Sequence, residues 1–309
     1  MEKNPESYVI NQREINYTSA DNETRIFAYI WEPNMQNNEK PKGILQISHD
    51  FAEHARRYEE LAKFYAGLGY IVCANDHIGH GKSAKGNGNI GHKFLAKDVY
   101  RMSMIIKKEF NLPVVLIGFG VGSLIARYVA CLWGMEYNGV VFCGTSSGNR
   151  IIDRLAAIVG KIKSKESRHR EPKWFNSISE RRNSRTFADE NWRTSIIEEQ
   201  EIYANDPFCG APLTYGGLRD LIKLNKIVNS RQWFGRIPKN LPIYLLSGLE
   251  DPIGDFGRGV LNIYMSLVVA GCANVEVKLY EDCRHEPLFD IAKEEAADDI
   301  NEWLDEILS

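Results

Sequence analysis

The sequence has little of several features that would restrict its class. Its 309 residues include six cysteines, with no Cys-x-x-Cys pair and no regular spacing, which argues against both disulfides and a metal site. Its apolar runs are far shorter than the roughly 20 residues that span a bilayer. The opening MEKNPESYVI also lacks the apolar core of a signal peptide. A formal net charge of −3 argues against a nucleic-acid partner. We therefore expect a cytoplasmic protein without a bound metal.

What the sequence does contain is an alternation of apolar runs and helical periodicities. Two β-like segments, residues 8–17 and 24–31, flank the turn-rich SADNE and predict an N-terminal hairpin. Further on, strand-like segments alternate with helical ones. The expected strands are 43–48, 70–75, 114–117 and 140–143, and the expected helices 57–67, 94–110 and 121–133. This rhythm indicates right-handed crossovers and a mostly parallel sheet, so the predicted fold class is α/β, doubly wound.

One segment breaks the alternation. Residues 146–232 contain no convincing strand, which predicts a cap or lid inserted between two parts of one core, 1–145 and 233–309. Within it, residues 150–185 hold eleven Lys or Arg against four Asp or Glu, a local charge of +7. Two interpretations stay open: a solvated helix face, or a lid that touches anionic membranes through its basic side chains and an apolar stripe from Ile151 to Ile158.

The stretch LIGFGVGSLIARYVA at 116–130 indicates a strand, a sharp turn and a helix. In α/β-hydrolases this pattern is the nucleophile elbow, G-x-S-x-G, whose central serine is exposed above the sheet in a strained turn. Here the central residue is Gly120. The stretch lacks the glycine spacing and downstream acidic residue of a dinucleotide fingerprint, so no cofactor is predicted.

Several further motifs carry a family resemblance. SHDFAEHARRYEELAKFYAGLGY, ANDHIGHGKSA, DPFCGAPLTYGGLRDL, LLSGLEDPIG and YEDCRHEPL resemble, in order and spacing, the monoacylglycerol lipase and lysophospholipase-like α/β-hydrolases, also labelled serine aminopeptidase-like. The resemblance runs from about residue 10 to 305. It implies the α/β-hydrolase fold, with a mostly parallel eight-stranded sheet and a helical cap. It also implies hydrolysis of carboxylic esters such as monoacylglycerols or lysophospholipids.

The resemblance also implies the site. Position 120 would be the nucleophile, Asp251 the acid and His285 the base, in the chain order of an α/β-hydrolase. Asp251 would orient the imidazole, and His285 would move the proton of the nucleophile. The oxyanion hole would consist of the backbone N–H groups of Phe51 and Val121.

Two departures from the family pattern affect activity. Gly120 has no Oγ, so the acyl-enzyme mechanism of a serine hydrolase is not expected of this chain. In addition, Asp50 replaces the glycine of the family's H-G-x-x-E-H loop. A carboxylate there would oppose the negative charge that develops in an oxyanion hole. We expect Gly120 to leave room for a water, with His285 bonded to that water or to Asp50.

Other groups could substitute for the missing serine. Ser123 lies about one helical turn past Gly120 and is interpreted as structural. Asp50 could attack as a carboxylate or activate a water with His285. Cys143 and Cys283 lie near strand ends, but neither is in a tight turn.

Two functions therefore stay open. In the first, the chain is a pseudo-hydrolase that binds an acyl or other small hydrophobic ligand. In the second, it is a serine ester hydrolase whose nucleophile has been replaced by Gly120. Fold alone does not decide between them.

Overall fold

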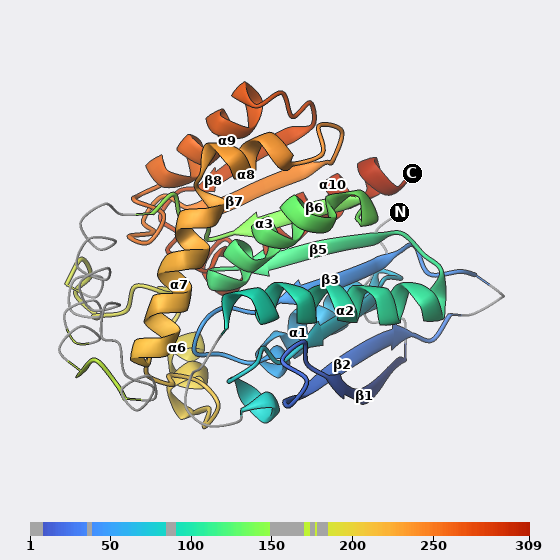
Figure 1. The fold of residues 1–309 in the computed structure, drawn as a ribbon, viewed down its shortest axis with the longest axis horizontal. Coiled ribbons are helices and arrows are strands. Elements are labelled where there is room, and N and C mark those ends of the chain that lie inside the picture. Colours follow the sequence, from blue (N-terminus) through green and yellow to red (C-terminus); the bar gives the residue numbers. More distant parts are fainter. Residues whose placement is uncertain (1–8, 36–38, 85–90, 149–169, 174–176, 178–184) are drawn as a thin grey trace.

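The computed structural model describes residues 9–35, 39–84, 91–148, 170–173, 177 and 185–309 (Figure 1). Most of the basic segment 150–185, including Ile151 to Ile158, lies outside these residues. In the described part of the chain, no helix is long and apolar enough to cross a membrane.

The core of the fold is one eight-stranded sheet. Its strands are β1 (Ile10–Thr18), β2 (Arg25–Pro33), β3 (Ile44–Ser48), β4 (Ile71–Asn75), β5 (Val114–Phe119), β6 (Gly139–Cys143), β7 (Ile243–Gly248) and β8 (Val275–Tyr280). Their spatial order is β1-β2-β4-β3-β5-β6-β7-β8. The hairpin β1–β2 joins antiparallel to β4, and all other neighbours are parallel. The predicted fold class, mostly parallel sheet and N-terminal hairpin are confirmed.

Helices cover both faces of this sheet (Figure 1). The main helices of the core are α1 (Glu59–Gly67), α2 (His92–Phe110), α3 (Val121–Trp133), α9 (Arg258–Val269) and α10 (Lys293–Leu308). One apolar cluster packs α2, α3 and α9 on one face, and a second packs α1 and α10 on the other. Strands β3 to β7 are buried throughout because both faces are covered.

Between β6 and β7, the described residues contain helices and no strand. These helices are α6 (Ile197–Asn205), α7 (Tyr215–Val228) and α8 (Arg231–Arg236). Helix α7 packs against α2 and α3, and buried Arg127 of α3 donates to the carbonyl of Val228 at 2.7 Å. This part of the chain is therefore fixed to the core on its C-terminal side.

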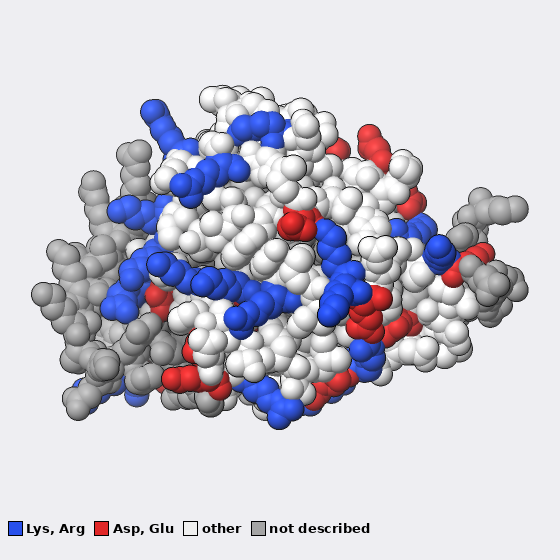
Figure 2. Space-filling model, turned by 45° about the vertical axis from the view of Figure 1, so that its right-hand side comes forward, with Lys and Arg blue, Asp and Glu red and all other residues white. Residues whose placement is uncertain are grey.

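Charged side chains of both signs share the molecular surface. Figure 2 shows a row of Lys and Arg side chains across one face, with Asp and Glu side chains beside and below it. The described surface in this view does not form a single basic field of the kind that binds nucleic acid.

Candidate functional site

The predicted acid and base lie together at one edge of the sheet. Asp251 follows β7 and His285 follows β8, and the carboxyl ends of parallel strands meet at the same edge. Nδ1 of His285 lies 2.9 Å from Oδ1 of Asp251. The hydroxyl of Ser247 and the amide of Ile253 donate to the Asp251 carboxylate at 2.9 and 2.8 Å. Because Asp251 and His285 are both buried, these contacts fix the orientation of the imidazole.

The two backbone donors predicted for an oxyanion hole also converge, and a carboxylate occupies them. The amide of Val121 donates to Oδ1 of Asp50 at 2.5 Å, and the amide of Phe51 donates to the same oxygen at 2.6 Å. Oδ2 of Asp50 lies 3.6 Å from Nε2 of His285. The side chain of Asp50 thus places one oxygen against the two amides predicted for the oxyanion hole, and turns the other toward His285.

Asp50 also fills the space of the expected nucleophile. Gly120 lies between β5 and α3 with φ 49° and ψ −114°, a conformation that glycine adopts readily and that would strain a residue with a side chain, as in the sharp turn of a nucleophile elbow. A Cβ atom added to Gly120 would overlap the carboxylate of Asp50, well inside van der Waals contact. The expectation of a water beside Gly120 is therefore wrong, because the carboxylate takes that space. The alternative expectation is a bond between His285 and Asp50, but Nε2 and Oδ2 lie 3.6 Å apart, as an ion pair that is too long for a hydrogen bond.

Two carboxylates flank the imidazole of His285 and decide its charge. Burial alone would lower the pKa of His285, but its contacts with Asp251 and Asp50 outweigh burial and raise the pKa well above the usual value. Burial alone would raise the pKa of the Asp50 carboxyl, but the nearby imidazole of His285 and the hydrogen bonds from the amides of Val121 and Phe51 lower it. The contacts with Asp251 and Asp50 therefore favour the protonated form of His285.

We expect His285 to remain protonated at about pH 7.5, where an unperturbed histidine, with a pKa of about 6.5, is mostly neutral. The substitution Asp50→Asn should lower the pKa of His285, because it removes one of the two negative charges. Ring ¹⁵N chemical shifts of labelled histidine, followed across pH, measure both effects, and His285→Gln assigns the resonance. A neutral imidazole at pH 7 in the unaltered chain would contradict the prediction.

The other substitute nucleophiles do not have the required surroundings. Burial raises the pKa of the thiols of Cys143 and Cys283, and nearby acidic groups raise it further, so the reactive thiolate is disfavoured. The hydroxyl of Ser123 donates to the carbonyl of Gly120 within the first turn of α3. Ser123 is therefore engaged in holding the elbow, as expected of a structural residue.

A buried ion network supports the loop that carries Asp50. The guanidinium of Arg57 lies 3.0 Å from Oε1 of Glu53 and 2.7 Å from Oε2 of Glu286. Tyr58 donates to the other oxygen of Glu53 at 2.8 Å. Burial raises the pKa of Glu53 to about 8, against the attraction of Arg57 and with the help of Glu286 and Asp50. Arg57 thus ties the β3 loop to the residue that follows His285.

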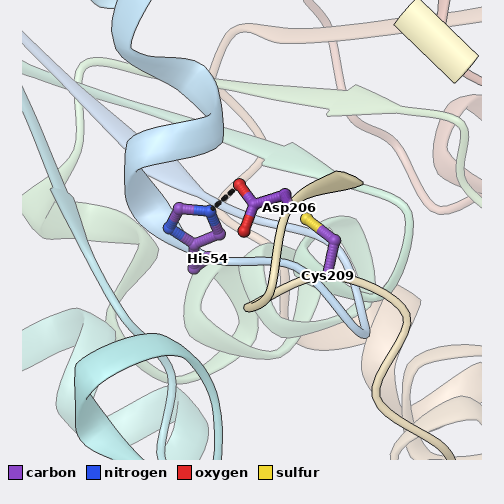
Figure 3. A group of neighbouring side chains, drawn as sticks. All are labelled: His54, Asp206 and Cys209. Carbon is purple, nitrogen blue, oxygen red and sulfur yellow. Dashed lines mark hydrogen bonds and ion pairs between the residues drawn. The ribbon is translucent and has the colours of Figure 1, made fainter. Parts of the chain in front are cut away.

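A second contact ties this loop to the segment after α6. Figure 3 shows the imidazole of His54 facing the carboxylate of Asp206, with Cys209 nearby in the same segment. The distance between Nε2 of His54 and Oδ2 of Asp206 is 2.8 Å. The amide of Gly210 donates to the carbonyl of Ala52 at 2.9 Å, beside this pair. His54 therefore has a structural role between the core and the helices that follow β6.

A sheet of this order, with a sharp elbow between β5 and α3, defines the class of the protein as the α/β-hydrolases. Over residues 39–292 the sequence matches the family described as serine aminopeptidase, S33, and the chain belongs to that family. The human monoglyceride lipase is 34% identical over 266 residues, covering 84% of this chain and 79% of the lipase. A monoglyceride lipase homolog of monkeypox virus is 26% identical over 295 residues, covering 90% and 94%.

Among solved structures, a thermostable carboxyl esterase from Bacillus coagulans, in complex with glycerol, superposes with a TM-score of 0.88 at 28% identity. The match covers 96% of this chain and 99% of the esterase. The chain is therefore an α/β-hydrolase similar to monoglyceride lipases and esterases, which confirms the predicted family.

Sequence reasoning missed two neighbours of the site. The ring of Trp192 lies 5.1 Å from the ring of His285 and comes from the segment between β6 and β7. Glu286 completes the pairing of Arg57. Glu286 is adjacent to His285 in the sequence, so its place near the site could have been predicted. Trp192 has no local pattern that points to the site, because only the folding of its segment over β8 brings it there.

Proposed function

We propose that this chain binds an acyl or similarly hydrophobic ligand and does not hydrolyse carboxylic esters by the serine mechanism of its family. One observation carries the proposal: the carboxylate of Asp50 accepts both oxyanion-hole amides and overlaps the place of a side chain at position 120. A substrate carbonyl would find neither a hydroxyl nucleophile nor vacant donors for its oxygen. The relatives named as monoglyceride lipases support a ligand with an acyl chain.

The residues that we assign to this site are those predicted from the family. Asp251 and His285 keep the contact of an acid and base pair, while Phe51 and Val121 supply donors that now hold Asp50. Their proposed role in this chain is to hold the carboxylate of Asp50 in a charged site rather than to activate Gly120.

The same overlap argues against the alternative of a serine enzyme altered at a single position. A serine at position 120 would collide with the carboxylate of Asp50 in its present position, so a serine site needs Asp50 displaced or replaced as well. Two concerted differences favour a chain that has lost serine chemistry as a whole.

We also propose that residues 146–232 form a cap between the two parts of the core, 1–145 and 233–309. The helices α6, α7 and α8, and the absence of a strand among the described residues of this range, support that division. The charge of +7 over residues 150–185 supports peripheral contact of the cap with anionic membranes.

Ligand binding can be measured separately from turnover. We expect 1-O-oleyl glycerol, an ether that no esterase cleaves, to bind and to change tryptophan emission through Trp192, which lies against His285. Equilibrium dialysis should give the same occupancy for Trp192→Phe, without that part of the emission change. We expect hydrolysis of monooleoylglycerol and of nitrophenyl butyrate to stay at background.

Absence of binding by dialysis would refute the ligand proposal. Ester turnover well above background in the unaltered chain would refute the proposed loss of ester hydrolysis. If a Gly120→Ala variant then had the same turnover, position 120 would not take part in that hydrolysis.

A further inference from the structure

The two oxygens of Asp50 have different surroundings. Oδ1 accepts the amides of Phe51 and Val121, whereas Oδ2 faces Nε2 of His285 at 3.6 Å, a distance too long for a hydrogen bond. The other ring nitrogen of His285 lies 2.9 Å from Asp251. Asp50, His285 and Asp251 thus form a row of three groups, in which a carboxylate lies where the family expects a hydroxyl.

Carboxylates are established nucleophiles in proteins, where they form covalent esters with the group they attack. The low pKa of Asp50 keeps its carboxylate ionised at neutral pH. Gly120, Phe51 and Val121, which border this carboxylate, are each partly exposed, so the site is not sealed on that side. The loop after β3 therefore places a carboxylate beside the position where the elbow lacks a side chain.

The position of Oδ1 decides which electrophile fits. When a nucleophile attacks a carbonyl carbon, the negative charge develops on the oxygen of the substrate, which needs the two amides. Here those amides already hold an oxygen of Asp50. Attack on a saturated carbon makes no such demand, because the charge develops on the leaving group instead.

We propose that Asp50 is the nucleophile of a hydrolase for alkyl electrophiles, and that its substrate is an epoxide on a hydrophobic chain. This inference rests on the proposed function for the hydrophobic chain alone. It goes beyond that function by assigning a reaction to the row Asp50, His285 and Asp251.

In the first step, Oδ2 of Asp50 forms a bond to an epoxide carbon as the bond from that carbon to the ring oxygen breaks. The ring oxygen takes the proton from Nε2 of His285 and becomes a hydroxyl. The product is an alkyl ester of Asp50 beside a neutral imidazole. The raised pKa of His285 suits this step, since the imidazole begins it protonated.

In the second step, neutral His285 takes a proton from a water, and the water oxygen attacks Cγ of Asp50. The negative charge then develops on Oδ1, where the amides of Phe51 and Val121 already donate. The bond between Cγ and Oδ2 breaks, the diol leaves with Oδ2 after taking the proton from His285, and the new carboxylic acid returns its proton to the imidazole. Epoxide and water have become a 1,2-diol.

Because the diol carries away an oxygen of Asp50, a single turnover in H₂¹⁸O distinguishes this route from direct attack by water. With enzyme in excess over 1,2-epoxydodecane, we expect unlabelled diol and one ¹⁸O in the peptide that contains Asp50. Asp50→Asn, which keeps an oxygen for the two amides, should form diol at least about 10³-fold more slowly. Diol that carries ¹⁸O after one turnover, or an equal rate in Asp50→Asn, would overturn the proposal.

The covalent ester can be trapped with a leaving group that needs no proton. We expect His285→Gln, treated with 1-bromododecane, to retain one dodecyl group on Asp50, as located by peptide mass spectrometry. The matched variant Asp50→Asn/His285→Gln should lack it, while alkylation of the partly exposed thiols of Cys131 and Cys209 is equal in both. No dodecyl group on Asp50 would overturn the proposal, whereas binding of 1-O-oleyl glycerol in the same samples tests the proposed function independently.

Discussion

The double variant Asp50→Gly/Gly120→Ser should hydrolyse nitrophenyl butyrate at least about 10³-fold faster than the unaltered chain, whereas Gly120→Ser alone should stay at background. Removal of the nucleophile lowers the turnover of a serine hydrolase by a factor on the order of 10⁶, so restoring the nucleophile can raise the turnover by a large factor. The single variant cannot recover it, because the Asp50 carboxylate overlaps the new Cβ and still occupies the oxyanion hole. Asp50→Gly removes the carboxylate from both the space beside position 120 and the oxyanion hole.

Two controls separate the steric from the electrostatic effect. Asp50→Gly alone empties the hole without supplying a hydroxyl, and we expect no serine-type turnover from it. Asp50→Asn/Gly120→Ser keeps a side chain of the same size in the hole and should also remain inactive. Burst kinetics and fluorophosphonate labelling of the introduced serine measure the acyl-enzyme step directly. Full activity in Gly120→Ser alone would show that Asp50 moves aside freely.

Replacement of Arg57 by methionine should cost about 3–5 kcal/mol of unfolding free energy, among the larger losses open to a single substitution here. Its side chain is 3% exposed and pairs with Glu53 and Glu286, which are 0% and 6% exposed. The variant leaves two carboxylates buried without their cation. Arg56→Met is the matched control, because that side chain is 50% exposed and pairs only near the surface, with Glu59. It should cost less than about 1 kcal/mol.

The loss in Arg57→Met should grow as the pH rises. In the unaltered chain the pKa of Glu53 is already raised from 4.5 to about 8 by burial, so the folded state binds its proton more tightly than the unfolded state does. Stability from such a group is present below the unfolded pKa and is lost as pH rises toward the folded one. Removal of Arg57 raises the folded pKa further. Guanidinium unfolding at about pH 5 and pH 8 should therefore give a larger difference at pH 8, and a pH-independent loss would contradict this account.

The structure explains why the two departures from the family pattern occur together. Gly120 and Asp50 lie far apart in the chain, yet they are in contact in the fold. Because Gly120 has no side chain, the carboxylate of Asp50 fits beside it. The carboxylate in turn accepts the hydrogen bond of the Val121 amide, which would otherwise have no partner in the absence of a substrate oxyanion. Under the proposed function, either difference alone would impair a serine hydrolase. Together they build a compact charged site, in which His285 is held between two carboxylates.

Local patterns in the sequence determined most of the fold. The predicted strand at 43–48 and β3, Ile44–Ser48, differ by one residue, and the predicted helix at 121–133 matches α3. These segments are fixed by apolar periodicity and by the glycines of the elbow, which act over a few residues. The resemblance to the family pointed to Asp251 and His285, and they lie together because parallel strands bring their carboxyl ends to one edge.

Tertiary structure alone decided what the site contains. The sequence places Asp50 in a loop beside the oxyanion hole, but it does not give the direction of the side chain, which depends on the distance between β3 and β5. Packing of these neighbouring strands brings the amide of Val121 within 2.5 Å of Oδ1 and excludes the water expected beside Gly120. The contacts of Trp192 and of Glu286 arise in the same way, from segments that meet only in the folded chain. Short-range sequence patterns determined where the strands, the elbow and the candidate residues lie. The partners of the Asp50 carboxylate depend instead on how β3, β5 and β8, which are distant in the sequence, are placed in the sheet.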